Sequence, residues 1–119
     1  MRALMLMTSL AVGAGACEAT GPHVDGVEPG RGARGATVVV RGAGFCGEGR
    51  AQAGGGCDPL PPGSVVFGLD LPAARGRIER WADDEIAVTV PAAAAVGPTV
   101  VVVTVDGRSS NGGDFEVLP

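Results

Sequence analysis

Short valine-rich segments separated by glycine and proline are the feature that most constrains the fold of this 119-residue chain. In Glu85–Val90 (EIAVTV) apolar and polar residues alternate, which places every second side chain on one face of a strand. Pro91 ends this segment, because proline cannot donate to a strand ladder. Seven segments are expected strands, of which Arg77–Trp81 is the weaker: His23–Val27, Thr37–Arg41, Ser64–Phe67, Arg77–Trp81, Glu85–Val90, Thr99–Val105 and Asp114–Leu118.

Helical signals are weak. Only Ala92–Val96 favours a helix, and the prolines and glycine beside it confine it to about one turn. Valine supplies most of the bulk, and its branched Cβ favours strands. Many short strands separated by turn residues predict an all-β sandwich.

The N-terminus has the layout of a secretory signal peptide. Arg2 precedes a short apolar run in Met1–Ala16, and small residues follow up to Cys17. The apolar run is shorter than the roughly 20 residues that span a bilayer. We therefore expect residues 1–16 to be a signal peptide, residues 17–23 a tether, and residues 24–119 one folded domain.

The cleavage zone fits two processing routes. Ala14-Gly15-Ala16 matches the A-x-A pattern of signal peptidase. Followed by Cys17, it also resembles the lipobox of bacterial lipoproteins, although that pattern prefers leucine where Ala14 stands. Lipidation of Cys17 would leave an even pair of cysteines, so we favour a membrane-anchored lipoprotein of the cell envelope over a soluble secreted protein.

Cys46 and Cys57 flank a glycine-rich stretch of ten residues. Exported chains meet an oxidising environment, and a structural zinc site needs four ligands, whereas the single histidine, His23, falls in the expected tether. A redox C-x-x-C motif has two intervening residues. The pair is therefore predicted to be a disulfide that staples a loop, with a contribution of about 3 kcal/mol to stability. We expect neither a metal nor a cofactor in this loop.

Charge argues against a nucleic-acid partner. The net charge is −4, and removal of Arg2 leaves eight arginines against thirteen acids, or −5. An acidic chain without a basic patch repels phosphate backbones.

Several segments, in order and spacing, resemble the IPT/TIG family, an immunoglobulin-like module shared by plexins and some transcription factors and common in bacterial surface proteins. The resemblance covers about residues 24–119, and the longer cysteine loop after Phe45 departs from it. It implies an immunoglobulin-like β-sandwich and no shared catalytic residues. The matching segments are Pro29-Gly30, Gly35–Phe45 (GATVVVRGAGF), Val65–Gly68 (VVFG), Trp81–Pro91 (WADDEIAVTVP), Ser110-Asn111 and Phe115–Val117.

Other motifs are better explained by structure than by chemistry. Gly30–Gly35 matches G-x-G-x-x-G, but it precedes a strand instead of a helix, so we predict a flexible turn with solvated arginines. Asp83–Glu85 is predicted to be a solvated turn, because calcium needs six to eight oxygen ligands. Trp81 is predicted to pack at a strand end instead of forming a sugar-stacking platform.

A catalytic site is not predicted. Ser64, Ser109 and Ser110 have no base nearby in the expected fold, because His23 falls in the tether. We expect a non-enzymatic cell-surface lipoprotein whose single domain binds an unknown protein or glycan. A structural spacer, an accessory subunit of an envelope complex and a secreted carbohydrate-binding module are the alternatives.

Overall fold

The structure, a computed structural model, describes residues 21–119, so the predicted signal peptide and Cys17 lie outside the described residues. Residues 21–119 form nine strands and contain no helix that is long and apolar enough to span a membrane. The strands are β1 (His23–Glu28), β2 (Arg31–Ala33), β3 (Thr37–Ala43), β4 (Gly63–Phe67), β5 (Arg77–Trp81), β6 (Glu85–Thr89), β7 (Gly97–Val105), β8 (Arg108–Ser109) and β9 (Gly113–Leu118).

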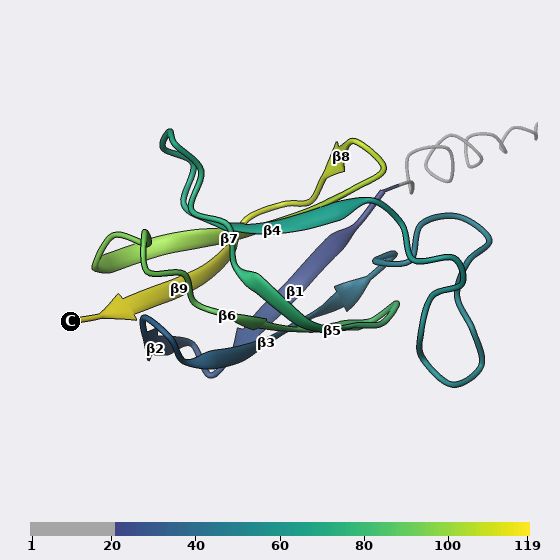
Figure 1. The fold of residues 1–119 in the computed structure, drawn as a ribbon, viewed down its shortest axis with the longest axis horizontal. Coiled ribbons are helices and arrows are strands. Elements are labelled where there is room, and N and C mark those ends of the chain that lie inside the picture. Colours follow the sequence, from purple (N-terminus) through teal and green to yellow (C-terminus); the bar gives the residue numbers. More distant parts are fainter. Residues whose placement is uncertain (1–20) are drawn as a thin grey trace, which may run out of the picture.

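Two sheets pack face to face as a β-sandwich (Figure 1). The first has the order β1-β3-β6-β5, and the second has the order β2-β9-β7-β4, with β8 also paired to β7. With β2 and β8 set aside, this is the strand order of a constant-type immunoglobulin domain, in which ABED packs on CFG. The seven longer strands correspond to the seven expected from the sequence, so the predicted all-β, immunoglobulin-like sandwich is confirmed.

The core follows the alternation of apolar residues along the strands. Inward residues of β6 and β7, such as Val88 and Val103, are fully buried, whereas their neighbours in the chain are more exposed. Phe67 and Phe115 meet edge to face at 5.6 Å between ring centroids. This core leaves only the loops and the outer sheet faces for function.

Asn111 joins the two sheets. Its side-chain oxygen accepts a hydrogen bond from the Val24 backbone N–H at 2.8 Å, and its amide nitrogen donates to the Val24 carbonyl at 2.8 Å. Val24 belongs to β1 of the first sheet, and Asn111 lies between β8 and β9 of the second sheet. The Ser110-Asn111 pair of the family pattern therefore has a structural role here.

Three local expectations are wrong. Arg31–Ala33 is strand β2, which pairs in parallel with β9, and not a flexible turn. His23 begins β1 opposite Ala43, in agreement with the expected strand His23–Val27 and against its assignment to the tether. Ala92–Val96 forms no helical turn: a backbone hydrogen bond from Ala94 to Pro91 closes a tight turn there.

Candidate functional site

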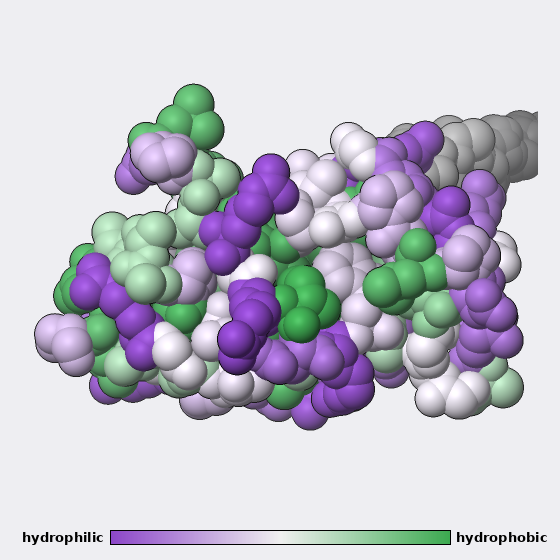
Figure 2. Space-filling view, viewed as in Figure 1, coloured by the Kyte–Doolittle hydropathy of each residue, from purple (hydrophilic) through white to green (hydrophobic). Residues whose placement is uncertain are grey.

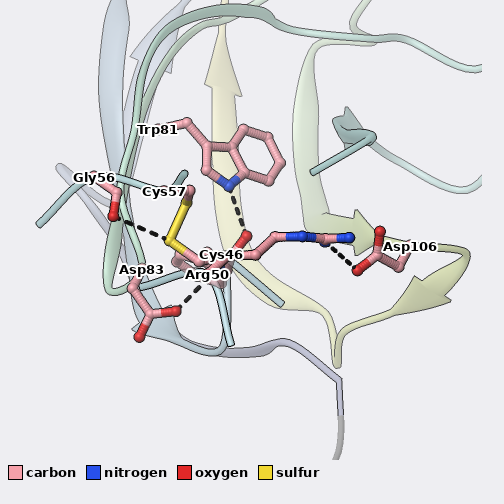
Figure 3. Close-up of a disulfide and its surroundings, with 8 residues drawn as sticks. Cys46, Arg50, Gly56, Cys57, Trp81, Asp83 and Asp106 are labelled. Carbon is pink, nitrogen blue, oxygen red and sulfur yellow. Dashed lines mark hydrogen bonds and ion pairs between the residues drawn. A yellow bond between two sulfur atoms is a disulfide. The ribbon is translucent and has the colours of Figure 1, made fainter. Parts of the chain in front are cut away.

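The cysteine loop connects β3 to β4 and contains the predicted disulfide (Figure 3). The Cα atoms of Cys46 and Cys57 lie 5.2 Å apart, which is within the usual range for a disulfide. Cys46 is fully buried and Cys57 is half-buried. The Cys46 sulfur lies 3.5 Å from the Gly56 carbonyl oxygen, but a disulfide sulfur carries no proton, so this approach is a contact and not a hydrogen bond.

Trp81 and Asp83 hold the start of the loop (Figure 3). The indole N–H of Trp81 donates to the Phe45 carbonyl at 2.7 Å, and the Asp83 carboxylate accepts from the Cys46 backbone N–H at 3.0 Å. Trp81 is only 9% exposed, which confirms that it packs at the end of β5. Its ring is therefore not available as a platform for sugar stacking.

Two β-bridges and an ion pair also fix the rest of the loop. Gly56 forms a β-bridge with Ala82, and Ala51 forms one with Cys57. The Arg50 guanidinium donates to the Asp106 carboxylate at 2.6 Å, which links this loop to the turn between β7 and β8. The loop is thus an ordered structural element, although its glycines offer few side chains that a ligand could contact.

An open depression of about 440 Å³ lies beside the loop. Gly21, Gly44 and Gly47 supply much of its wall, together with the charged residues Glu48, Asp106 and Arg108. Arg50 already neutralises Asp106. Within residues 21–119, no three histidine, cysteine or acidic side chains converge as a metal cluster.

The outer face of the second sheet carries a small apolar patch, bordered by the polar pair Ser64 and Thr104 and by Asp114, which lies opposite Val100. Val66 of β4 lies directly opposite Val102 of β7, and Val100 lies two residues earlier on β7. All three side chains point away from the core and are half-buried. We call Val66, Val100 and Val102 the valine face.

The connection from β4 to β5 projects from the sandwich beside this face (Figure 1). Its tip is hydrophobic in the space-filling view (Figure 2), and Leu69 and Leu71 are 73% and 90% exposed. Its base is closed by backbone hydrogen bonds from Phe67 to Ala74 at 2.8 Å and from Gly76 to Val65 at 2.9 Å. We call residues 68–76 the leucine arm.

The outer face of the first sheet is more highly charged, because a ladder of ion pairs crosses its four strands. Arg41 donates to Glu28 at 2.8 Å and lies 3.7 Å from Glu85, which in turn accepts from Arg80 at 2.9 Å. The hydrogen bond from Arg80 lowers the pKa of Glu85, and the hydrogen bond with Glu28 raises the pKa of Arg41. The charged side chains on this face therefore neutralise one another.

Sheet edges offer little room for an added strand. The edge strands β1 and β5 of the first sheet each contain an irregularity in register, at Asp25 and at Glu79. In the second sheet β2 has only three residues, and the β4 edge is covered by a bridge from Val66 to Arg75. Short, bulged or covered edges resist pairing with another chain.

Four other residues considered in the sequence analysis have structural partners within residues 21–119: Asp83, Glu85, Ser110 and His23. Asp83 and Glu85 have separate structural partners and do not act as one acidic cluster. The Ser110 hydroxyl accepts from the Val103 backbone N–H at 2.9 Å and donates to the Asn111 carbonyl at 2.7 Å. His23 is exposed and pairs with Asp25 at 3.2 Å.

The arginines of the Gly30–Gly35 motif are exposed to solvent, as expected, and each also has a polar partner. Arg31 lies 3.5 Å from the Glu116 carboxylate, and Arg34 donates to the Ala94 carbonyl at 2.7 Å. The pair of exposed leucines on the arm had no distinctive signal in the sequence, because single exposed apolar residues are common in loops.

Comparison with known proteins supports the architecture. No family model and no curated protein matches the chain. The chain is similar to the crystal structure of Gamma-CGTASE from Alkalophilic bacillus clarkii, with 30% identity and a TM-score of 0.62 over 83% of this chain and 12% of that chain. It is also similar to a structural genomics protein of unknown function from Bacteroides thetaiotaomicron, with 18% identity and a TM-score of 0.62 over 84% of this chain and 22% of that chain. In both, the matched region is a small part of a longer chain.

Proposed function

We propose that this chain is a non-enzymatic lipoprotein of the cell envelope, whose single IPT/TIG-like domain is a protein-interaction module. The observation that carries the proposal is the contrast between the two outer faces. The first sheet neutralises its own charges, whereas the second presents the valine face beside two highly exposed leucines. Apolar surface of this kind on a folded domain marks an interaction site.

The chemistry of this surface favours a protein partner over a glycan. Aromatic stacking platforms would support glycan binding, but Phe45, Phe67, Trp81 and Phe115, the aromatic residues of the chain, are all buried. Aliphatic side chains that stand clear of the surface instead suit an apolar pocket on another protein. The small share that the matched region takes of both similar structures supports a modular role.

Anchoring at Cys17 agrees with this placement of the surface. Cys17 lies four residues before Gly21, and four extended residues span at most about 14 Å. Gly21 adjoins Gly44 and Gly47 beside the cysteine loop. Gly63 at the start of β4 pairs with Val105 at this same end, and the leucine arm leaves from the other end of β4. A lipid at Cys17 would thus hold the cysteine-loop end toward the membrane and leave the arm accessible.

Membrane fractionation tests the anchor. The wild-type protein should partition into the detergent phase, and the Cys17→Ala variant should be released in soluble form, because a diacyl or triacyl cysteine gives stable membrane residence whereas a single chain is marginal. Equal release of both proteins would contradict lipidation and leave a soluble secreted protein.

A further inference from the structure

The leucine arm is the most exposed apolar feature of the described residues. Leu71 is 90% exposed and Leu69 is 73% exposed, while the hydrogen bonds at the base hold the arm in place. A preformed, projecting apolar loop loses little conformational entropy when it docks. It is therefore suited to insert against a partner without refolding.

The charges of the arm are self-complementary. Asp70 lies between the two leucines at the tip, and Arg75 lies at the foot, where it bridges to Val66. Both side chains are exposed, and neither makes an ion pair within residues 21–119. About a two-fold axis perpendicular to the arms, the arms of two copies run in opposite directions, and the contact is reciprocal, so the tip of each arm meets the foot of the other. Each Asp70 would then face an Arg75.

From these observations we propose that the partner of the leucine arm and the valine face is a second copy of this chain. The inference rests on the proposed function, since copies anchored at the same end hold their arms at the same height above the membrane. Confinement to one surface also raises the effective concentration of the two copies. Leu69 and Leu71 of each copy pack on the valine face of the other, and the two Asp70–Arg75 pairs fix the register.

The valine face is a necessary part of this interface. A standard interface buries about 800 Å² per partner, which is more than two leucine side chains supply. Val66, Val100 and Val102 extend the apolar surface from the arm across β4 and β7. Gly68 begins the arm with a hydrogen bond to the Val100 carbonyl at 2.8 Å, so the arm and the face form one continuous surface.

Photo-crosslinking in the native envelope tests the proposal. The full-length protein would be co-expressed in two tagged forms, with a photo-reactive residue in place of Leu71. A matched control places the same residue at Leu60, which is 60% exposed but lies after Cys57, in the connection between β3 and β4. We expect a product of twice the chain mass that carries both tags from position 71, and at most a small fraction of it from position 60.

The outcomes separate this inference from the proposed function. A product from position 71 with a different envelope protein alone would overturn pairing of two copies and retain the interaction module. Absence of any product at position 71, or equal products at 71 and 60, would overturn both.

Charge reversal provides an independent readout. With the photo-reactive residue still at position 71, Asp70→Arg should lower the yield of the two-tag product about tenfold. The two-fold contact contains two Asp70–Arg75 pairs, so the variant loses two attractive pairs and gains two repulsive ones. The double variant Asp70→Arg with Arg75→Asp should restore the product, because the charges are exchanged but still complementary. An unchanged yield in the single variant, or no recovery in the double variant, would overturn the register proposed for the two arms.

Discussion

Replacement of Asn111 by alanine tests how the two sheets are held together. The change removes two hydrogen bonds, both 2.8 Å long, between the Asn111 amide and the Val24 backbone. Each such bond contributes about 1 kcal/mol net, so Asn111→Ala should lower the free energy of unfolding by about 2 kcal/mol. For a domain of this size that corresponds to a fall in Tm of roughly 8–16 °C, measured by circular dichroism together with urea unfolding.

Two further variants make the Asn111 prediction specific. Asn111→Asp retains an acceptor for the Val24 N–H but cannot donate to the Val24 carbonyl, so it should also be destabilised near neutral pH. Gln52→Ala is the matched control, because its side-chain amide is exposed and makes no hydrogen bond within the described residues. Stability of Asn111→Asp equal to that of the wild type, or equal losses in Asn111→Ala and Gln52→Ala, would refute the reasoning.

Two more changes test the disulfide and the charged face. Substitution of both Cys46 and Cys57 by alanine should lower the free energy of unfolding by about 3 kcal/mol, as expected for a disulfide between residues 11 positions apart. If urea unfolding shows that the free energy of unfolding falls by less than about 1 kcal/mol, the disulfide contributes little to stability. Glu79 and Glu85 have lowered pKa values in the folded state, caused first by the Thr89 hydroxyl and by Arg80 respectively, so their contribution to stability is present above the unfolded pKa and is lost as the pH falls through the folded value. As the pH falls below about 5, the double variant Glu79→Gln with Glu85→Gln should therefore lose less stability than the wild type, whereas identical pH profiles would contradict a stabilising role for these two carboxylates.

The sequence predicted the longer strands because alternation is a local signal. In β6, for example, Ile86 and Val88 face the core as the EIAVTV pattern requires. The predicted pair of Cys46 and Cys57 is likewise present, because the cysteine count and spacing left few alternatives. Features that depend on residues close together in the chain could therefore be predicted from the sequence alone.

Features that depend on contacts between residues far apart in the chain could not be predicted from the sequence. Strand β2 exists because it pairs with β9, more than 80 residues later, and the sequence Arg-Gly-Ala has no strand preference of its own. The same holds for the bonds between Asn111 and Val24, which are 87 positions apart. The leucine arm also escaped prediction, because exposure is a property of the folded surface and not of the residues Leu69 and Leu71.

The cysteine loop and the leucine arm are the two alternative locations for the binding site, and separate variants distinguish them. Replacement of Gly47–Gly56 by a short turn, together with loss of both cysteines, should cost a few kcal/mol of stability at most but leave partner capture nearly intact. The loop offers Arg50 and Gln52 as its main specific contacts, and Arg50 is already engaged by Asp106. The arm, by contrast, presents two leucines that make few contacts within the domain.

The most direct test measures partner capture by general chemical crosslinking in the native envelope, followed by pull-down of the tagged protein, for two variants that remain folded by circular dichroism. In one, Leu69 and Leu71 are both changed to serine; in the other, the cysteine loop is shortened as above. The account predicts that the serine variant loses capture while the shortened loop retains it. Retained capture in the serine variant, with loss in the shortened loop, would place the binding site on the cysteine loop and contradict the account.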